Sequence, residues 1–154
     1  MSETANVVVA AFMLLFASMY LGTGWSLVLF SFPLAPRLTP ETYALPFLEP
    51  IRNATRFFTV MTTAMLVAGA ALTVGEADSE YLWVPIVYLA GVIGATLVTV
   101  VLIFPYNQEL RAGVTDPDRL RVVLRKWMRL TVVRVVLWTT QWVAVALYLV
   151  LKAA

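Results

Sequence analysis

Residues 130–151 read LTVVRVVLWTTQWVAVALYLVL, and this stretch decides the fold. Arg134 is its one charged residue. An apolar run of about 20 residues is long enough for an α-helix to cross the hydrocarbon core of a bilayer. The stretch therefore predicts a transmembrane helix, and it raises the question of why such a helix keeps an arginine.

Three further apolar runs have the same character, at about residues 6–32, 57–74 and 82–104. Hydrophobic residues make up 61% of the chain and charged residues 13%, a balance typical of membrane proteins. We therefore expect one all-α domain over residues 1–154, an integral membrane antiparallel four-helix bundle. Residues 33–56 and 105–129 are the longer connecting segments.

The basic residues predict the orientation of the bundle. Segments 33–56 and 105–129 hold nine of the eleven lysines and arginines, whereas the loop at 75–81 holds only acidic charges. The positive-inside rule then puts both basic segments in the cytoplasm and both chain termini outside. We expect the protein in a bacterial inner (plasma) membrane.

Composition also excludes several kinds of site. The chain has no cysteine and no histidine, so disulfides, thiol chemistry and the usual metal ligands are excluded. No cluster of carboxylates lies within the apolar runs, and we expect neither a metal nor a cofactor. A net charge of +2 is too small for a nucleic-acid-binding protein.

Small residues recur at helical spacing in the apolar runs, as at Ala10, Ala17 and Gly24 and in the stretch 90–95. Such faces let helix backbones approach closely in lipid. They could serve the bundle itself, a homo-oligomer or a larger membrane complex. Membrane lipids are the other expected partners.

The last helix is predicted to be longer than a membrane span. Asp116 and Pro117 give an N-cap and first-turn signal, and no helix breaker follows before Lys152. A helix of that length outruns the bilayer. We expect its start to project into the cytoplasm as a basic element at the membrane surface, with an apolar stripe at Leu120, Val123, Leu124 and Trp127. We expect Pro105 to end the third span.

The sequence of the first cytoplasmic segment predicts a short helix that starts at Thr39 and a second helix that starts at Glu49. Arg52, Asn53 and Arg56 follow the second start, and the two arginines are four residues apart on one helix face. They could bind an anionic ligand or anchor the helix to anionic headgroups.

Arg134 shares one face of the last helix with other polar and aromatic residues. At 100° per residue this face also contains Trp127, Thr131, Trp138 and Gln141. An arginine inside a span faces the bundle and finds a partner. Glu49 and Glu109 are candidate carboxylates, Asn53 and Asn107 are candidate amides, and Trp138 could stack on the guanidinium. The arginine either fixes the helix in place or lines a pocket with Asn107 and Trp127.

Short motifs at these positions resemble a known family. Pro105-x-Asn107-x-x-Leu110, followed by Trp127-x6-Arg134, is similar to the DUF1772 or anthrone oxygenase family of small four-span membrane proteins. The resemblance implies oxidation of anthrones without a bound cofactor for some members. It carries over to Asn107, Trp127 and Arg134. The family often has asparagine or histidine where this chain has Thr131. Because the chain has no histidine at all, a histidine base is not available here.

Two functions follow as hypotheses. The first is an accessory subunit or a binder of a hydrophobic ligand, lipid or quinone-like, at the cytoplasmic interface. The second is an anthrone oxygenase-like enzyme, in which Arg134 stabilises a substrate anion and Glu49 or Glu109 acts as base. A proton-coupled exporter is disfavoured, because no Asp or Glu lies within the predicted spans.

Overall fold

The computed structural model describes residues 2–153, apart from the side chains of residues 50–54. The elements in chain order are α1 (Glu3–Ser26), η1 (Leu27–Ser31), η2 (Phe32–Arg37), η3 (Ala44–Leu48), α2 (Glu49–Gly75), α3 (Trp83–Leu97), η4 (Val98–Ile103), α4 (Phe104–Ala112) and α5 (Pro117–Ala153). Within the described residues, four helical stretches are long and apolar enough to span a membrane, at Glu3–Arg37, Thr55–Gly75, Trp83–Ala112 and Pro117–Ala153. The predicted all-α bundle of four long apolar helices is confirmed.

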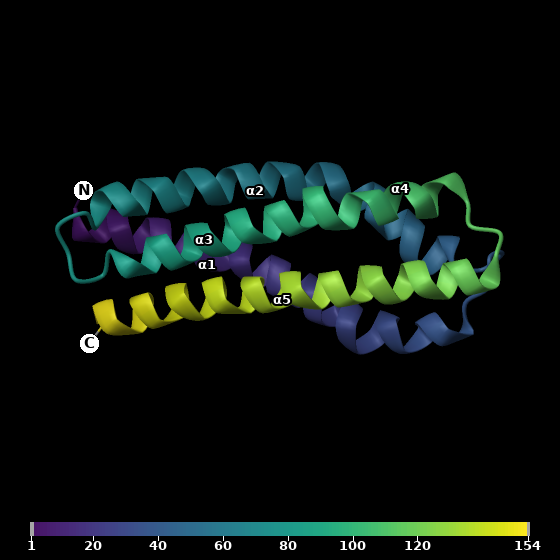
Figure 1. Cartoon of the computed structure of the whole chain (residues 1–154). Coiled ribbons are helices and arrows are strands. Elements are labelled where there is room, and N and C mark those ends of the chain that lie inside the picture. Colours follow the sequence, from purple (N-terminus) through teal and green to yellow (C-terminus); the bar gives the residue numbers. More distant parts are fainter. Residues whose placement is uncertain (1, 154) are drawn as a thin grey trace.

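The four long helices surround the core in a fixed order. α5 packs against α1 and α3, and α2 packs against the same two helices from the other side. Helices α2 and α5 are thus diagonal neighbours, and both chain termini lie at one end of the bundle (Figure 1). Because α2 and α5 do not pack directly on each other, only side chains occupy the space between them.

Gly24 permits a close approach of α1 to α5. A Cβ added to Gly24 would lie 2.7 Å from Val135 Cγ2 and 2.9 Å from the ring of Trp138. Ala10 and Ala17, on the same face, are fully buried. The small-residue face of α1 therefore serves contacts within the bundle.

The helix of the third predicted span does not end at Pro105. The helix continues from α3 through the π-helical segment η4 into α4, and Pro105 lies in the first turn of α4. Proline is tolerated there because the first turn of a helix does not need its N–H groups. The hydrogen bonding changes from α- to π-helical just before Pro105. A new α-helix can therefore start at this point while the chain stays helical.

A short helix does not form at Thr39. Residues 39–43 make one turn, in which the Thr39 carbonyl accepts hydrogen bonds from the backbone N–H groups of Thr42 and Tyr43. A π-helical turn, η3, follows and runs directly into α2 at Glu49. The second predicted start, at Glu49, is where α2 begins.

The long last helix is confirmed, but its expected surface stripe is not. α5 has 37 residues and begins at Pro117, and the Asp116 carboxylate accepts a hydrogen bond from the backbone N–H of Asp118. The four stripe residues are buried in a second core with side chains of η2, η3 and α4. The first turns of α5 therefore cover a packed subdomain of the same chain and leave no apolar stripe for the membrane surface.

Candidate functional site

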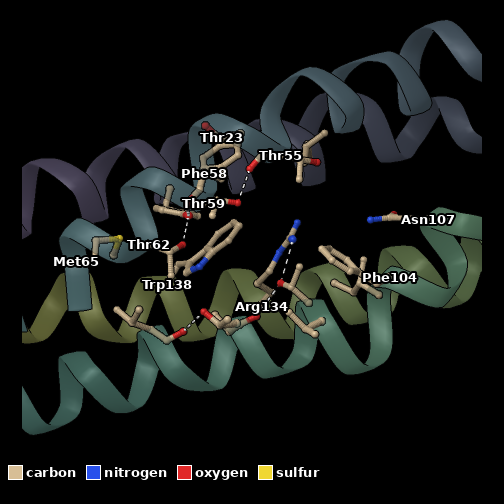
Figure 2. Close-up of a pocket in the computed structure, with 18 of the residues that line it drawn as sticks. Thr23, Thr55, Phe58, Thr59, Thr62, Met65, Phe104, Asn107, Arg134 and Trp138 are labelled. Carbon is tan, nitrogen blue, oxygen red and sulfur yellow. Dashed lines mark hydrogen bonds between the residues drawn. The ribbon is translucent and has the colours of Figure 1, made fainter. Parts of the chain in front are cut away.

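A pocket of about 450 Å³ lies between α2 and α5, in the half of the bundle away from the chain termini. Its volume is in the range of small-molecule sites. The described lining residues are mostly apolar, with seven threonines, Tyr20, Asn107, Arg134 and Gln141 as the main polar groups (Figure 2). None of these lining residues is a carboxylate.

Arg134 provides the positive charge of the pocket. α5 carries it into the space facing α2, as Figure 2 shows. Its Nη1 lies 3.4 Å from the Thr99 hydroxyl, and its guanidinium carbon lies 4.6 Å from the centre of the Trp138 ring. Its Nε has no hydrogen-bond partner, and among the described residues Arg134 forms no ion pair.

The contact with Thr99 is a weak one. The Thr99 hydroxyl already donates to the Ala95 carbonyl at 2.7 Å, a much shorter hydrogen bond. The predicted stacking of Trp138 on Arg134 is present, and cation–π contacts are worth about 0.5–2 kcal/mol. A guanidinium held by one ring and one long contact keeps most of its hydrogen-bonding capacity for another molecule.

Asn107 directs a second donor into the pocket. The indole Nε1 of Trp127 donates to the Asn107 side-chain oxygen at 2.8 Å. Because an indole N–H can only donate, this contact fixes which end of the amide is oxygen. The NH₂ group of Asn107 is left to point toward Arg134 in Figure 2. Trp127 is itself held edge-on by Phe32 and Phe47.

An aromatic stack forms the wall beyond Arg134. The Trp138 ring packs on Tyr20 at 4.8 Å between centroids, and Tyr20 packs on Phe58 at 4.7 Å. The Tyr20 hydroxyl lies 2.6 Å from that of Thr62 and donates to the Phe58 carbonyl at 2.8 Å. This stack joins α5, α1 and α2 and gives the pocket an apolar floor.

Gln141 is also one of the residues that line the pocket. Its side chain is fully buried, and neither its Oε1 nor its Nε2 has a hydrogen-bond partner. Thr131 is also fully buried with an unpartnered hydroxyl, but it is not among the residues that line the pocket. The predicted polar face of α5 is therefore turned inward, and Gln141 lines the pocket without a hydrogen-bond partner among the described residues.

The pocket opens sideways between the helices. Several lining residues are exposed on the outer surface of the bundle, namely Thr23 on α1, Thr59 and Thr63 on α2, and Val100 and Phe104 at the end of the third helical stretch. These positions lie within the candidate spans. The opening therefore faces the region that lipid would occupy.

Three π-helical segments contribute residues to the pocket, and one of them, η3, contributes Pro46 and Phe47. η1 contributes Leu27, and η4 contributes Thr99, Val100 and Ile103. A π-helical turn holds one residue more than an α-helical turn and widens the helix, and such turns are frequent at functional sites.

The structure brings together Asn107, Trp127, Arg134, Trp138 and Gln141, and it leaves other predicted site residues elsewhere. Glu109 forms an ion pair with Arg119, and Glu49, at the start of α2, is not a lining residue. Arg56 is exposed. The side chains of Arg52 and Asn53 lie outside the described residues.

One buried acid was not predicted. Glu76 follows α2 in what reads as an acidic surface loop, yet its exposure is only 2%. It lies at the end of the bundle near the chain termini, where Asn6, Tyr148 and Lys152 surround it. The approach of these three residues, distant in sequence, is a tertiary feature that a local pattern does not reveal.

Comparison of the chain with protein-family models, with curated proteins and with solved structures finds no match.

Proposed function

We propose that the protein is a four-span integral membrane protein that binds a hydrophobic, lipid-like ligand with an acidic oxygen group at one end. The observation that carries this proposal is Arg134, a charged side chain inside a candidate span that has no carboxylate partner among the described residues. A charged side chain in the middle of a membrane helix costs about 2.5–3.5 kcal/mol on insertion scales and marks functional sites.

The donors around Arg134 favour a carboxylate or a phenolate as the ligand's polar end. The guanidinium offers parallel N–H donors, and the Asn107 NH₂ group approaches from the other side. A carboxylate accepts several hydrogen bonds at once and supplies the missing negative charge. The apolar part of the ligand would then lie on Trp138 and the neighbouring aromatic rings.

The lateral opening supports uptake of the ligand from the bilayer. A ligand dissolved in lipid would reach the pocket between α2 and α3, past Thr59, Thr63 and Val100. Replacement of Thr59 by tryptophan should obstruct this route and slow binding of a lipid-dissolved ligand. The isosteric Thr59→Val leaves the opening its size and is the control.

The proposal is tested by comparing the binding of a charged ligand with that of a neutral ligand of the same length. Equilibrium binding of stearic acid and of stearyl alcohol would be measured with the purified protein in detergent. We expect the acid to bind more tightly than the alcohol to the native protein. Arg134→Leu should weaken binding of the acid about 10- to 100-fold, the size expected for loss of hydrogen bonds to a charged group, and should leave the alcohol unaffected.

The matched control is Arg129→Leu, an exposed arginine on the same helix. This variant should bind the acid as the native protein does. Equal binding of the acid by the Arg134 and Arg129 variants would contradict the proposal.

The proposed orientation places the pocket in the cytoplasmic half of the membrane, with both termini outside. Since the chain has no cysteine, single cysteines can be introduced without background labelling. Asp78 and Thr115 are exposed at opposite ends of the bundle. Asp78→Cys should react with a membrane-impermeant maleimide in intact cells, and Thr115→Cys only after lysis. The reverse pattern would invert the orientation.

An anthrone oxygenase-like activity is a second candidate. It is favoured by the meeting of Asn107 and Arg134 at one aromatic-walled pocket, because those positions carry the sequence resemblance. Arg134 would stabilise the anion formed when the substrate loses a proton. Oxygen uptake with anthrone, present in the native protein and lost in Arg134→Leu, would support it. Absence of uptake by protein that binds the compound would refute it.

A further inference from the structure

We propose that the ligand carries a second polar group, a hydroxyl, about 10 Å from its acidic end, and that Gln141 binds it. This inference rests on the proposed function, because it concerns the same pocket. It assigns the ligand to the class of long-chain acids with a hydroxyl in mid-chain.

The unpartnered amide of Gln141 is the first observation. A primary amide has two donors and two acceptor sites, and the described structure leaves all of them unsatisfied at 0% exposure. A buried polar group without a partner costs about 1–3 kcal/mol. A leucine would fill a similar volume without that cost, so packing alone does not account for a glutamine here.

The neighbouring helix makes room for this amide. Gly91 on α3 faces Gln141, and a Cβ added to Gly91 would lie 3.0 Å from the Gln141 Oε1 and 3.0 Å from its Cβ. A Cβ at position 91 would therefore require the glutamine side chain to shift by a few tenths of an ångström. α3 thus accommodates the polar side chain without offering it a hydrogen bond.

The spacing of Gln141 from Arg134 defines the ligand. The two residues lie on the same face of α5, both line the pocket, and seven residues of helix separate them by about 10 Å. Trp138 lies between them, with Val92 and Ala95 on the facing helix. These three residues present an apolar surface between the two polar groups.

A hydroxyl suits the amide of Gln141 better than a purely accepting or donating group. Its O–H can donate to Oε1 while its lone pairs accept from Nε2. The terminal torsion of a glutamine side chain is broad, so the amide can turn toward a ligand that reaches it. The acid end remains at Arg134, where the charge is.

The test crosses two ligands with two residues. Stearic acid and stearic acid hydroxylated in mid-chain would be bound to the native protein, to Gln141→Leu and to Arg134→Leu. We expect the hydroxy acid to bind the native protein about tenfold more tightly than stearic acid, and Gln141→Leu to abolish this preference without weakening stearic acid. The control Thr140→Val changes the adjacent, exposed residue, which is outside this pocket.

The outcomes separate the inference from the proposed function. Equal binding of the two acids by the native protein, still dependent on Arg134, would overturn the hydroxyl inference and leave the binding of acids standing. Binding of both acids that is insensitive to Arg134→Leu would overturn both. Gln141→Leu removes an unsatisfied amide and should fold, so its loss of preference would not reflect unfolding. Thermal melting of each variant checks this.

Discussion

The Tyr148 hydroxyl donates a 2.6 Å hydrogen bond to Glu76 Oε1, and this contact joins the end of α5 to the end of α2. The same oxygen accepts from Asn6 Nδ2 at 2.7 Å, and Lys152 Nζ lies 3.4 Å away. The Lys152 ammonium also lies over the rings of Tyr81 and Tyr148. One carboxylate therefore joins α1, α2 and α5 at the end of the bundle opposite the candidate pocket.

Acid should weaken this junction. Burial by itself would raise the pKa of Glu76, but hydrogen bonds from Ser79, Tyr148 and Asn6 and the Lys152 charge lower it below the ordinary value of 4.5. A carboxylate with a lowered pKa stabilises the folded state above its unfolded pKa, and this contribution is lost as the pH falls through the folded value. Melting temperature should therefore fall below about pH 4.5 in the native protein and change less with pH in Glu76→Gln.

The control for this prediction is Glu80→Gln, an exposed acid in the same loop. It should keep the acid dependence of the native protein. An unchanged pH profile in Glu76→Gln would show that the acid sensitivity arises at other carboxylates.

Loss of the Tyr148 hydroxyl should destabilise the bundle. Tyr148→Phe keeps the ring contacts and leaves Glu76 with one donor fewer, at a cost of about 1–2 kcal/mol. For a chain of this size that corresponds to a fall in melting temperature of about 2–8 °C. Tyr106→Phe, at the other end of the bundle, should melt like the native protein. Equal melting of the two variants would contradict a stabilising role for the contact.

Arg134 should not be needed for folding. Its protein contacts are one stacked ring and one 3.4 Å approach to Thr99, against the cost of a charge within the bundle. Arg134→Leu should therefore melt at the native temperature or slightly above it in ligand-free detergent solution. A fall of several degrees would instead support the view that Arg134 fixes α5 to its neighbours.

Gly24 and Gly22 form a matched pair on α1. A Cβ at Gly24 meets Val135 and Trp138 at under 3 Å, whereas a Cβ at Gly22 meets nothing within 4 Å. Gly24→Ala should lower the free energy of unfolding by about 1–3 kcal/mol because the close contact of α1 with α5 must open. Gly22→Ala should raise it by up to about 1 kcal/mol through helix propensity. Thermal melting of both variants in the same detergent shows whether each substitution stabilises or destabilises the protein.

Trp127 should act on the ligand through Asn107. Trp127→Phe removes the N–H that fixes the Asn107 amide, while much of the aromatic packing on Phe32 and Phe47 is kept. Affinity for stearic acid should fall about three- to tenfold, because a rotated amide can present oxygen to the ligand's carboxylate. Affinity should fall further in the conservative variant Asn107→Asp, because its carboxylate places a second negative charge beside that of the ligand. Native affinity in Trp127→Phe would contradict the positioning role.

The long helices and the inward face of α5 could be predicted because each depends on residues near one another in the chain. Apolar length marks the spans, and the 100° step of a helix places Trp127, Arg134 and Trp138 on one side. The bond between Asn107 and Trp127 needs two helices to meet, and no local pattern specifies that meeting.

The sequence did not predict several other features correctly, for a similar reason. Pro105 reads as a stop, and only the π-helical turn before it lets the helix continue. Leu120 and its neighbours form an amphipathic stripe whatever covers them, so the stripe could not distinguish membrane from the chain's own η3 and α4. Glu76 lies in a stretch that has the composition of a surface loop. Its side chain is buried by contacts with residues about 70 positions away in the sequence.

The π-helical segment η4 makes the shape of the pocket depend on the number of residues as well as on their identity. A turn of this kind is an α-helix with one residue inserted, so removal of a single residue from Val98–Ile103 would restore regular winding. Because the wider π-helical turn already absorbs the extra residue, the helix beyond the deletion would keep nearly the same face toward the bundle, and the widened turn beside the pocket would be lost. The lining residues of η4 itself, Thr99, Val100 and Ile103, would be repositioned while Asn107 stayed near Trp127. Insertions and deletions in this segment therefore offer a means of changing ligand preference that point substitutions do not.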